Sequence, residues 1–542
     1  MKKTITLSLF MLFFTAQAQQ VAIPQGQTLT LTSSLTFQGV DETEAYPGVG
    51  QYEIFYDNIN QQLDKPIFLV DGFDPTDSRT IPMVYEMLNY GTGQNLATDL
   101  RNQGFDIIIL NFPNYSRPGT STLVQGGSDY IQRNAFVLIE LINMINGLKS
   151  GDEKNVVIGP SMGGLIARYA LRHMELNAME HDTRLYVSFD APHRGANIPI
   201  GFQHLFNYMA SGPLGDPTLQ IIVNAMLKSP ASRQMLIDQF EGHLASGSAT
   251  EFNPNITLPV GKPGYRDVFQ AELDAMGFPE QTRNVAIANG SSTGMMTNTP
   301  GMEVMNHEFY TADTQRAIIE VNYTPLAGQT IEVSRFRAQV NIFVWITLYE
   351  SAASSQAPAA SGGLDTAPGG MFDLTSLENL AASNALLTEF FDNLNTSVFT
   401  FIPSLSALGV NNPNWYSTVS GASQTPFDAV YLESGNTNHV TLTAGNTEFV
   451  LNEILNPLST PEQLAGAVRF LNPAIEVLYI QSDVVLPRAE LTITDINGKI
   501  VQRENLGDWQ GMREIPLSMA NGLYFIRLTS DVGTTVQKLI KQ

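Results

Sequence analysis

Residues 155–171 read Asn-Val-Val-Ile-Gly-Pro-Ser-Met-Gly-Gly-Leu-Ile-Ala-Arg-Tyr-Ala-Leu. The apolar run 155–158 predicts a short strand and residues 164–174 predict a helix, so a Gly-x-Ser-x-Gly pattern falls at the turn between them. A serine on so tight a turn takes strained backbone angles, and the flanking glycines let the chain bend without clashes. The turn therefore presents the hydroxyl of Ser161 as a candidate nucleophile. A glycine-rich turn without chemistry is the alternative.

Apolar strands alternate with amphipathic helices on both sides of this turn. Further helices are expected over residues 88–104, 129–145 and 443–455. Further strands are expected at residues 28–37, 50–56, 66–70, 106–110, 184–189, 283–288 and 430–432. Strands that alternate with helices form a parallel sheet through right-handed crossovers. The predicted fold class is α/β, with a doubly wound, mostly parallel sheet spanning a domain from residue 19 to 457.

The run Ser161-Met-Gly-Gly-Leu-Ile-Ala-Arg-Tyr-Ala-Leu171 resembles the α/β-hydrolase superfamily, in particular its lipase branch and related membrane-lipid deacylases. Pro160 stands where those relatives usually have histidine. The resemblance implies a lipase or carboxylesterase that cleaves carboxylic esters with a Ser-His-Asp triad through an acyl-enzyme. It implies no metal and no organic cofactor. A serine peptidase or amidase, or a catalytically silent surface binding protein on the same fold, is the alternative.

Two backbone N–H groups are the candidates for an oxyanion hole. The N–H of Met162 lies at the start of the predicted helix and can point at a developing oxyanion. The second donor is expected after the strand 66–70, where the chain reads Asp-Gly-Phe-Asp. We choose the N–H of Phe73, because Gly72 lets the chain approach closely. The His-Gly-Gly-Gly run of many esterases is absent from the sequence.

The general base is to be chosen among seven histidines, at positions 173, 181, 193, 204, 243, 307 and 439. His193 lies in Ala-Pro-His-Arg-Gly, which resembles a lipase segment whose histidine is structural, so we reject it. His439 follows the last predicted strand and precedes the last predicted helix, which is the expected place for the base. His307 is the alternative, and an exposed loop histidine without a catalytic role remains open.

Asp190 is the candidate catalytic acid because it ends the predicted strand 184–189, as in pancreatic-type lipases. Most α/β-hydrolases carry the acid after the next strand, which here ends in Ala-Asn-Gly without a carboxylate. Asp428 is the alternative. Either choice keeps the chain order Ser, Asp, His.

Two insertions are the expected sources of substrate choice. Residues 202–260 hold apolar helical segments at 202–209, 219–226 and 232–240, which predict a cap or lid, with ordinary core helices as the alternative. The second insertion, residues 327–375, contains an alternating hairpin pattern over 330–349 and an Ala, Ser, Gly and Pro-rich loop over 351–370. Phe343 and Trp345 are candidates to line an acyl or sugar site, or to lie in the core.

The first residues predict export. Two lysines precede an apolar run at 5–14, and small residues follow at 16 and 18, a pattern typical of a signal peptide over residues 1–18. An uncleaved anchor is the alternative, and the apolar run is short for a membrane span. We expect no transmembrane segment in the mature protein.

The last residues predict a separate module. Residues 470–542 alternate apolar and polar residues between glycine turns, which predicts a small all-β sandwich after a linker at 458–469. The motifs Asn-Pro-Ala, Asp-x-x-Gly-Lys, Asn-Gly-x-Tyr-Phe and a closing Lys-Leu-Ile-Lys resemble the C-terminal sorting domain of the type IX secretion system. The resemblance implies a Bacteroidota protein that reaches the periplasm by Sec export and then crosses the outer membrane, with the secretion machinery as a partner.

Composition excludes several classes of function. With 29 Lys and Arg against 52 Asp and Glu, the chain has a formal net charge of -23. Such a chain is repelled by phosphate backbones and by anionic membranes, so we expect no nucleic-acid partner. The sequence contains no cysteine, which excludes disulfides, thiolate metal sites and a cysteine nucleophile.

Overall fold

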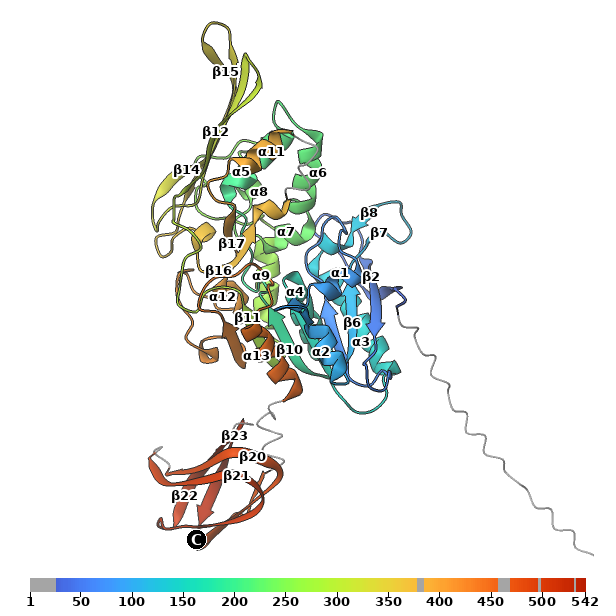
Figure 1. The fold of residues 1–542 in the computed structure, drawn as a ribbon, viewed down its shortest axis with the longest axis vertical. Helices are drawn as coiled ribbons and strands as arrows, with labels where there is room; N and C mark the ends of the chain where they lie inside the picture. Colours follow the sequence, from blue (N-terminus) through green and yellow to red (C-terminus); the bar gives the residue numbers. More distant parts are fainter. Residues whose placement is uncertain (1–25, 378–384, 457–467, 496–498, 531–532) are drawn as a thin grey trace, which may run out of the picture.

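The computed structural model describes residues 26–377, 385–456, 468–495, 499–530 and 533–542 (Figure 1). The predicted signal peptide and nearly all of the predicted linker lie outside these ranges. Across them, no helix combines the length and the apolar character that a membrane span needs.

An eight-stranded sheet forms the centre of the larger part of the chain. Its strands, in spatial order, are β1 (Leu29–Phe37), β2 (Tyr46–Phe55), β6 (Asp106–Asn111), β3 (Pro66–Val70), β9 (Asn155–Pro160), β10 (Thr183–Phe189), β11 (Arg283–Ala288) and β18 (Ala429–Leu432). Strand β2 runs antiparallel to both of its neighbours. All other pairings, from β6 to β18, are parallel. The predicted α/β class with a mostly parallel sheet is confirmed.

Helices cover both faces of this sheet, which explains why its central strands are continuous apolar runs. The helices α3 (Ile131–Leu148) and α4 (Met162–Leu176) pack on one face (Figure 1). The helices α1 (Ile81–Glu86), α2 (Leu96–Asn102) and α13 (Ala444–Leu455) pack on the other. Successive residues of β3 enter opposite cores, with Phe68 and Val70 on the α3 face and Ile67 and Leu69 on the α1 face.

The predicted helix over residues 88–104 is wrong in its first half. A small hairpin of β4 (Asn89–Tyr90) and β5 (Gln94–Asn95) stands there, and its turn contains two glycines with positive φ, Gly91 and Gly93. The helix begins only after Asn95, whose side chain accepts a hydrogen bond from the N–H of Thr98. The two glycines favour a turn, and the N-cap at Asn95 sets the start of the helix. The helix is therefore shorter than the apolar spacing predicts.

The segment between β10 and β11 is mainly helical, as predicted. It contains α5 (Ile200–Ser211), α6 (Pro217–Met226), α7 (Pro230–Met235), α8 (Phe240–His243) and α9 (Arg266–Met276). The third predicted segment, 232–240, is shorter than expected, because α7 ends at Met235 and an extended stretch precedes α8.

The segment between β11 and β18 carries a second, antiparallel sheet. Its strands are β12 (Glu303–Ala312), β13 (Gln315–Asn322), β14 (Thr330–Asn341) and β15 (Trp345–Gln356), in that order. The predicted hairpin is therefore present and longer than expected, and the first residues of the predicted loop 351–370 belong to β15. Next, β16 (Gly369–Asp373) pairs with β17 (Val398–Pro403), and α11 (Ala385–Asp392) lies between them in the chain.

The remaining short elements connect these layers. They are β7 (Asn114–Ser116), β8 (Leu123–Gln125), α12 (Ser404–Ala407), and the 3₁₀ turns η1 (Gly126–Ser128), η2 (Leu364–Thr366), η3 (Leu374–Leu377) and η4 (Ala422–Gln424).

The C-terminal residues form a β-rich unit with its own apolar core. Its strands are β19 (Val468–Phe470), β20 (Val477–Asp495), β21 (Ile500–Pro516), β22 (Gly522–Ser530) and β23 (Gly533–Lys541). They pair antiparallel in the order β19, β20, β22, β23, and β21 pairs with β20 as well. The buried cluster includes Leu478, Leu491 and Ile526. The β-rich character is confirmed, and the sandwich arrangement stays a prediction.

Candidate active site

Ser161 stands on a sharp turn between β9 and α4, with φ 55° and ψ −132°. Its N–H donates to the carbonyl of Phe189 over 2.9 Å, which ties the turn to the end of β10. The neighbouring positions 159 and 163 have no room for a side chain. A Cβ on Gly159 would lie 2.5 Å from the Gly163 carbonyl oxygen, and one on Gly163 would lie 2.2 Å from the carbonyl oxygen of Val70. The turn thus has the strained geometry that the sequence pattern predicts.

His439 lies in the loop between β18 and α13, beside Ser161. Its ring Nε2 is 2.8 Å from Ser161 Oγ. Its backbone N–H donates to the Met371 carbonyl over 2.8 Å, so β16 holds the loop in place. The ring of Phe401 packs edge-on against the imidazole, with centroids 5.0 Å apart. His439 is therefore held through its backbone by β16 and through its ring by Phe401 of β17.

Asp190 lies directly after β10 and completes a line of three side chains. Its Oδ2 is 2.7 Å from His439 Nδ1, and its Oδ1 accepts the N–H of Asn289 over 3.0 Å. The carboxyl group is fully buried and the backbone has φ 48°. Because β9, β10 and β11 run parallel, their carboxyl ends place Ser161, Asp190 and Asn289 at one edge of the sheet.

Gly370 is a residue that sequence reasoning missed. A Cβ at this position would lie 2.0 Å from Asp190 Oδ2, so only glycine leaves room for the carboxylate. Gly370 is at the end of the stretch predicted to be a flexible loop, but it lies in β16, next to the Met371 carbonyl that holds His439. The pair Gly369-Gly370 was the only sequence signal for this position. The sequence does not show that Gly370 lies against Asp190, because the two residues are far apart in the chain.

The structure places the alternative candidates elsewhere. His307 lies on β12, where its Nε2 is 2.9 Å from Glu389 Oε1 on α11. Asp428 precedes β18, where it accepts the N–H of Asn284 over 2.7 Å. That contact lies at the opposite end of the parallel strands from Ser161, because Asn284 is at the start of β11.

His193, rejected as the base, is buried under the sheet edge. Its Nε2 is 2.8 Å from Ser188 Oγ, and its ring packs against Phe278 and Phe427. Burial, with the positive charges of two nearby arginines, holds the pKa of His193 well below its usual range. This ring is therefore neutral at ordinary pH.

The two candidate oxyanion donors flank Ser161. Met162 is the first residue of α4, where backbone N–H groups have no partner within the helix. Phe73 lies on the other side, after Gly72, whose added Cβ would come 3.1 Å from Ser161 Cβ. The Phe73 carbonyl accepts a hydrogen bond from Arg79 Nη2 over 2.9 Å, which fixes the loop after Gly72.

Asp71 and Arg79 hold the loop that carries Phe73. Arg79 Nη2 is 3.1 Å from Asp71 Oδ1, and the same carboxylate oxygen accepts the N–H of Gly72 over 2.7 Å. Burial raises the pKa of Asp71, although Arg79 and the Gly72 N–H oppose this rise. The pair anchors the loop at the end of β3.

Ser161 and His439 open into a cavity of about 740 Å³, and Phe73 forms part of its wall. Apolar side chains supply most of the remaining wall: Phe202 and Phe206 of α5, Leu219, Ile222, Val223 and Met226 of α6, Phe372 of β16, and Phe399 and Phe401 of β17. This volume is within the range of ordinary small-molecule sites. The residues predicted as a cap therefore form one side of the cavity.

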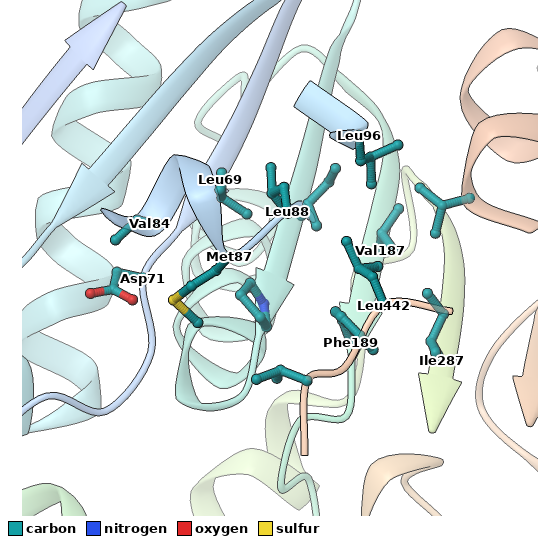
Figure 2. Close-up of a pocket in the computed structure, with 14 residues that line it drawn as sticks. Leu69, Asp71, Val84, Met87, Leu88, Leu96, Val187, Phe189, Ile287 and Leu442 are labelled. Atoms are coloured by element: carbon teal, nitrogen blue, oxygen red, sulfur yellow. The ribbon is translucent and has the colours of Figure 1, made fainter. Parts of the chain in front are cut away.

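A second, much smaller pocket lies on the other face of the sheet. Figure 2 shows it between α1 and the strands β10 and β11, with Leu69, Val187 and Leu442 around it and Asp71 and Met87 at one side. Its volume is only about 30 Å³, and its walls are apolar apart from Asp71. We assign no substrate to it.

Phe343 and Trp345 do not line the large cavity. Both lie at the far end of the β14–β15 hairpin, and Phe343 is fully exposed. Within the described ranges, no three His, Asp or Glu side chains come together as metal ligands would.

The comparisons with known families identify the end of the chain. Residues 470–542 match the family model described as the secretion system C-terminal sorting domain. These residues are a secretion-system sorting domain. The predicted module is thereby confirmed, and it points to a secreted or cell-surface protein. No curated protein matches the chain.

Several lipases and esterases of known structure are similar to the body of the chain. The mature lipase BlEst2 of Bacillus licheniformis is 14% identical over 44% of this chain and 72% of its own, with a TM-score of 0.26. Its propeptide form is 12% identical over 90% and 96%, with a TM-score of 0.28. The match to Est1E from Butyrivibrio proteoclasticus, 10% identical with a TM-score of 0.19, covers 30% of this chain and about half (51%) of Est1E.

The fold class itself rests on the mostly parallel sheet, and the strained serine turn follows β9, the fifth strand of that sheet along the chain.

Proposed function

We propose that this chain is an exported serine ester hydrolase, a lipase or carboxylesterase, with Ser161 as nucleophile, His439 as general base and Asp190 as the acid. One observation carries the proposal. Ser161 Oγ lies 2.8 Å from His439 Nε2, and His439 Nδ1 lies 2.7 Å from Asp190 Oδ2. Ser161 and His439 line an apolar cavity. Nucleophile, base and orienting carboxylate are the parts that acyl transfer requires.

The first half of the reaction forms the acyl-enzyme. The Asp190 carboxylate accepts the Nδ1–H of His439, so Nε2 is left to take the Ser161 proton as Oγ attacks the ester carbonyl carbon. The N–H groups of Met162 and Phe73 donate to the oxyanion that develops. When the tetrahedral intermediate collapses, His439 returns its proton to the leaving alcohol and the acyl group stays on Ser161.

The second half releases the acid. A water molecule gives a proton to His439 Nε2 and its oxygen attacks the acyl carbonyl carbon. The bond to Ser161 Oγ then breaks, the carboxylic acid leaves, and His439 returns the proton to Ser161. The enzyme is regenerated without any outside reagent besides water.

The cavity wall favours acyl chains over peptides. The surfaces of α5, α6 and β17 that face it are aromatic and aliphatic, which suits an alkyl chain. A bound peptide needs hydrogen-bond partners for each buried amide, and such a wall offers few. We therefore favour ester substrates with medium or long acyl chains over a peptidase or amidase activity.

The test is a series of initial rates on p-nitrophenyl esters from acetyl to hexadecanoyl. We expect rates to rise with chain length beyond acetyl, and Ser161→Ala to lower kcat by at least about 10⁴-fold. His307→Ala is the matched control, because His307 pairs with Glu389 away from Ser161, and it should keep the wild-type rate. Equal rates for wild type and Ser161→Ala would overturn the proposal.

A further inference from the structure

The tip of the β14–β15 hairpin extends beyond the rest of its sheet (Figure 1). The pairing of β13 with β14 ends at Gln315 and Val340, whereas β14 and β15 continue to pair up to Asn341 and Trp345. The three residues between that last pair are all apolar and all exposed. They are Ile342 at 58%, Phe343 at 101% and Val344 at 66% exposure.

This tip does not have the composition of a turn that faces water. Hairpin turns usually use Gly, Asn or Asp, which take positive φ without strain. Here Phe343 takes φ 85°, a costly conformation for an aromatic residue. Residues 338–349 carry no charged side chain, and Ile346 and Leu348, on the face of β15 below the tip, are also exposed. The chain thus keeps an apolar projection at a cost in backbone strain and in exposed surface.

Aromatic and basic side chains lie directly below this tip. The ring of Trp345 packs against Tyr310 of β12, with centroids 6.1 Å apart. The guanidinium of Arg316 on β13 stacks over the same indole at 4.2 Å. Arg316 also pairs with Glu308, whose Oε2 lies 2.6 Å from Arg316 Nη1 and accepts from the Tyr310 hydroxyl over 2.8 Å. Trp and Tyr beside such a polar, charged pair are the side chains that concentrate where a protein passes from hydrocarbon to lipid headgroups.

The size of the tip distinguishes a lipid surface from a protein partner. A stable protein interface buries about 800 Å² on each side, more than the few apolar side chains at the end of one hairpin present. A fluid hydrocarbon layer needs no complementary surface, and each apolar side chain gains free energy on entering it. The net charge of -23 favours neutral or zwitterionic lipid over anionic lipid.

The hairpin is fixed to a helix that lines the candidate active site. His204 on α5 contacts both strands of the hairpin, with Nδ1 3.0 Å from Ser334 Oγ and Nε2 3.1 Å from Ser351 Oγ. Phe202 and Phe206 of the same helix line the cavity beside Ser161. A tip held in a lipid layer would therefore tether α5 and the cavity wall to that surface through the length of the hairpin.

We propose that residues 342–346 insert into the apolar layer of a neutral or zwitterionic lipid surface and hold the enzyme on it. The substrates supplied by such a surface are lipid esters, a point that rests on the proposed function. Insertion itself involves no bond breaking, so it is testable on a chain without the nucleophile.

The experiment measures the binding of full-length Ser161→Ala protein to phosphatidylcholine vesicles by co-flotation. Adding Phe343→Asp places a charge in the hydrocarbon layer, and we expect the partition coefficient to fall at least about tenfold. Ile59→Asp is the matched control, since Ile59 is 69% exposed on the loop after β2, and it should leave binding unchanged. Equal vesicle binding with and without Phe343→Asp overturns the proposal, as does a self-association in sedimentation that Phe343→Asp abolishes while vesicles do not bind.

A second measurement separates this proposal from the proposed function. With Ser161 intact, Phe343→Asp should leave hydrolysis of soluble p-nitrophenyl acetate unchanged and slow hydrolysis of an ester embedded in the same vesicles. If neither ester is hydrolysed but binding depends on Phe343, the proposed function fails and the insertion stands. If the embedded ester is hydrolysed at the same rate with and without Phe343→Asp, the insertion fails.

Discussion

Ser161 and Asp190 share an uncommon backbone conformation, with φ 55° and 48°, and Val440, next to His439, has φ 52°. Residues other than glycine rarely adopt a positive φ, because their Cβ crowds the backbone. Such strain persists only where the surroundings fix it, here through the sheet edge and β16. The residues proposed to react are thus held in place before any substrate binds, which is what electrostatic stabilisation of a transition state requires.

Gly370→Ala is expected to damage the site without replacing any of its three candidate catalytic side chains. The new Cβ would meet Asp190 Oδ2 at 2.0 Å, so the carboxylate must move away from His439. A displacement of about 1 Å costs on the order of 10²-fold in rate, and we expect at least that loss in kcat on p-nitrophenyl butanoate. Gly147→Ala is the control, because its Cβ meets no atom within 4 Å. A variant with normal kcat would show that Asp190 does not orient the base.

The candidate residues could be chosen from sequence because each follows a strand or precedes a helix. Ser161 lies at a motif, and Asp190 ends a strand that runs parallel to the one before Ser161, so the two meet at one edge. Asp428 precedes its strand and therefore lies at the other edge. Gly370 could not be found this way, because its contact with Asp190 joins segments far apart in the chain and follows no periodicity.

At the scale of elements, α5 connects the second sheet to the cavity through His204. Burial lowers the pKa of His204 to about 4, so its ring is neutral between Ser334 and Ser351. The groups packed around it include Tyr208, Phe252 and, through Ser351, the carboxylate of Glu251. Protonation of this ring would put a charge into a buried contact between helix and hairpin.

Because of His204, the free energy of unfolding should decrease as the pH is lowered. The folded pKa lies below the unfolded value, so the unfolded chain binds more protons between about pH 6.5 and 4. As the pH falls through that range, His204 lowers the free energy of unfolding by up to roughly 3 kcal/mol. We expect His204→Gln to be less stable than wild type at pH 7.5 and to lose less stability by pH 5, measured by urea unfolding. Parallel pH curves for the two proteins would contradict this assignment.

Helices and strands could be predicted where the apolar residues follow one helical or strand period. They could not be predicted where a turn interrupts that period. The apolar strands and the helix α3 have a clear periodicity, and they lie within a few residues of their predicted bounds. The segment 88–104 failed because two glycines support a hairpin that apolar spacing does not reveal. Residues 351–356 are mostly serine and alanine, which favour no strand, but their pairing with β14 makes them one.

At the scale of the whole chain, the C-terminal unit has an apolar cluster of its own, apart from the two clusters around the large sheet. The described residues of the sorting domain bury Leu478, Leu491 and their neighbours within residues 468–539, separately from the clusters around the large sheet. A unit with its own core can fold by itself. The chemistry proposed for Ser161 is therefore expected to be independent of the domain that directs export.

Removing residues 468–542 is expected to leave the ester hydrolase intact and to stop its export. The kcat and KM of the shortened chain should match those of the full chain, because none of the described cavity residues lies in the removed part. In a host that carries the secretion system, activity should remain in the cells and not appear in the medium or on the surface. Loss of hydrolysis in the purified shortened chain would contradict the independence of the two units.

Covalent labelling tests the central proposal most directly. The full chain is treated with a p-nitrophenyl alkylphosphonate, which transfers its phosphonyl group to an activated serine, and the modified peptide is located by mass spectrometry. We predict one adduct per chain, on Ser161 in the peptide that contains residues 155–167, and strongly slowed labelling in His439→Ala. An adduct on a different residue, or equal labelling of Ser161→Ala, would contradict the assignment of the nucleophile.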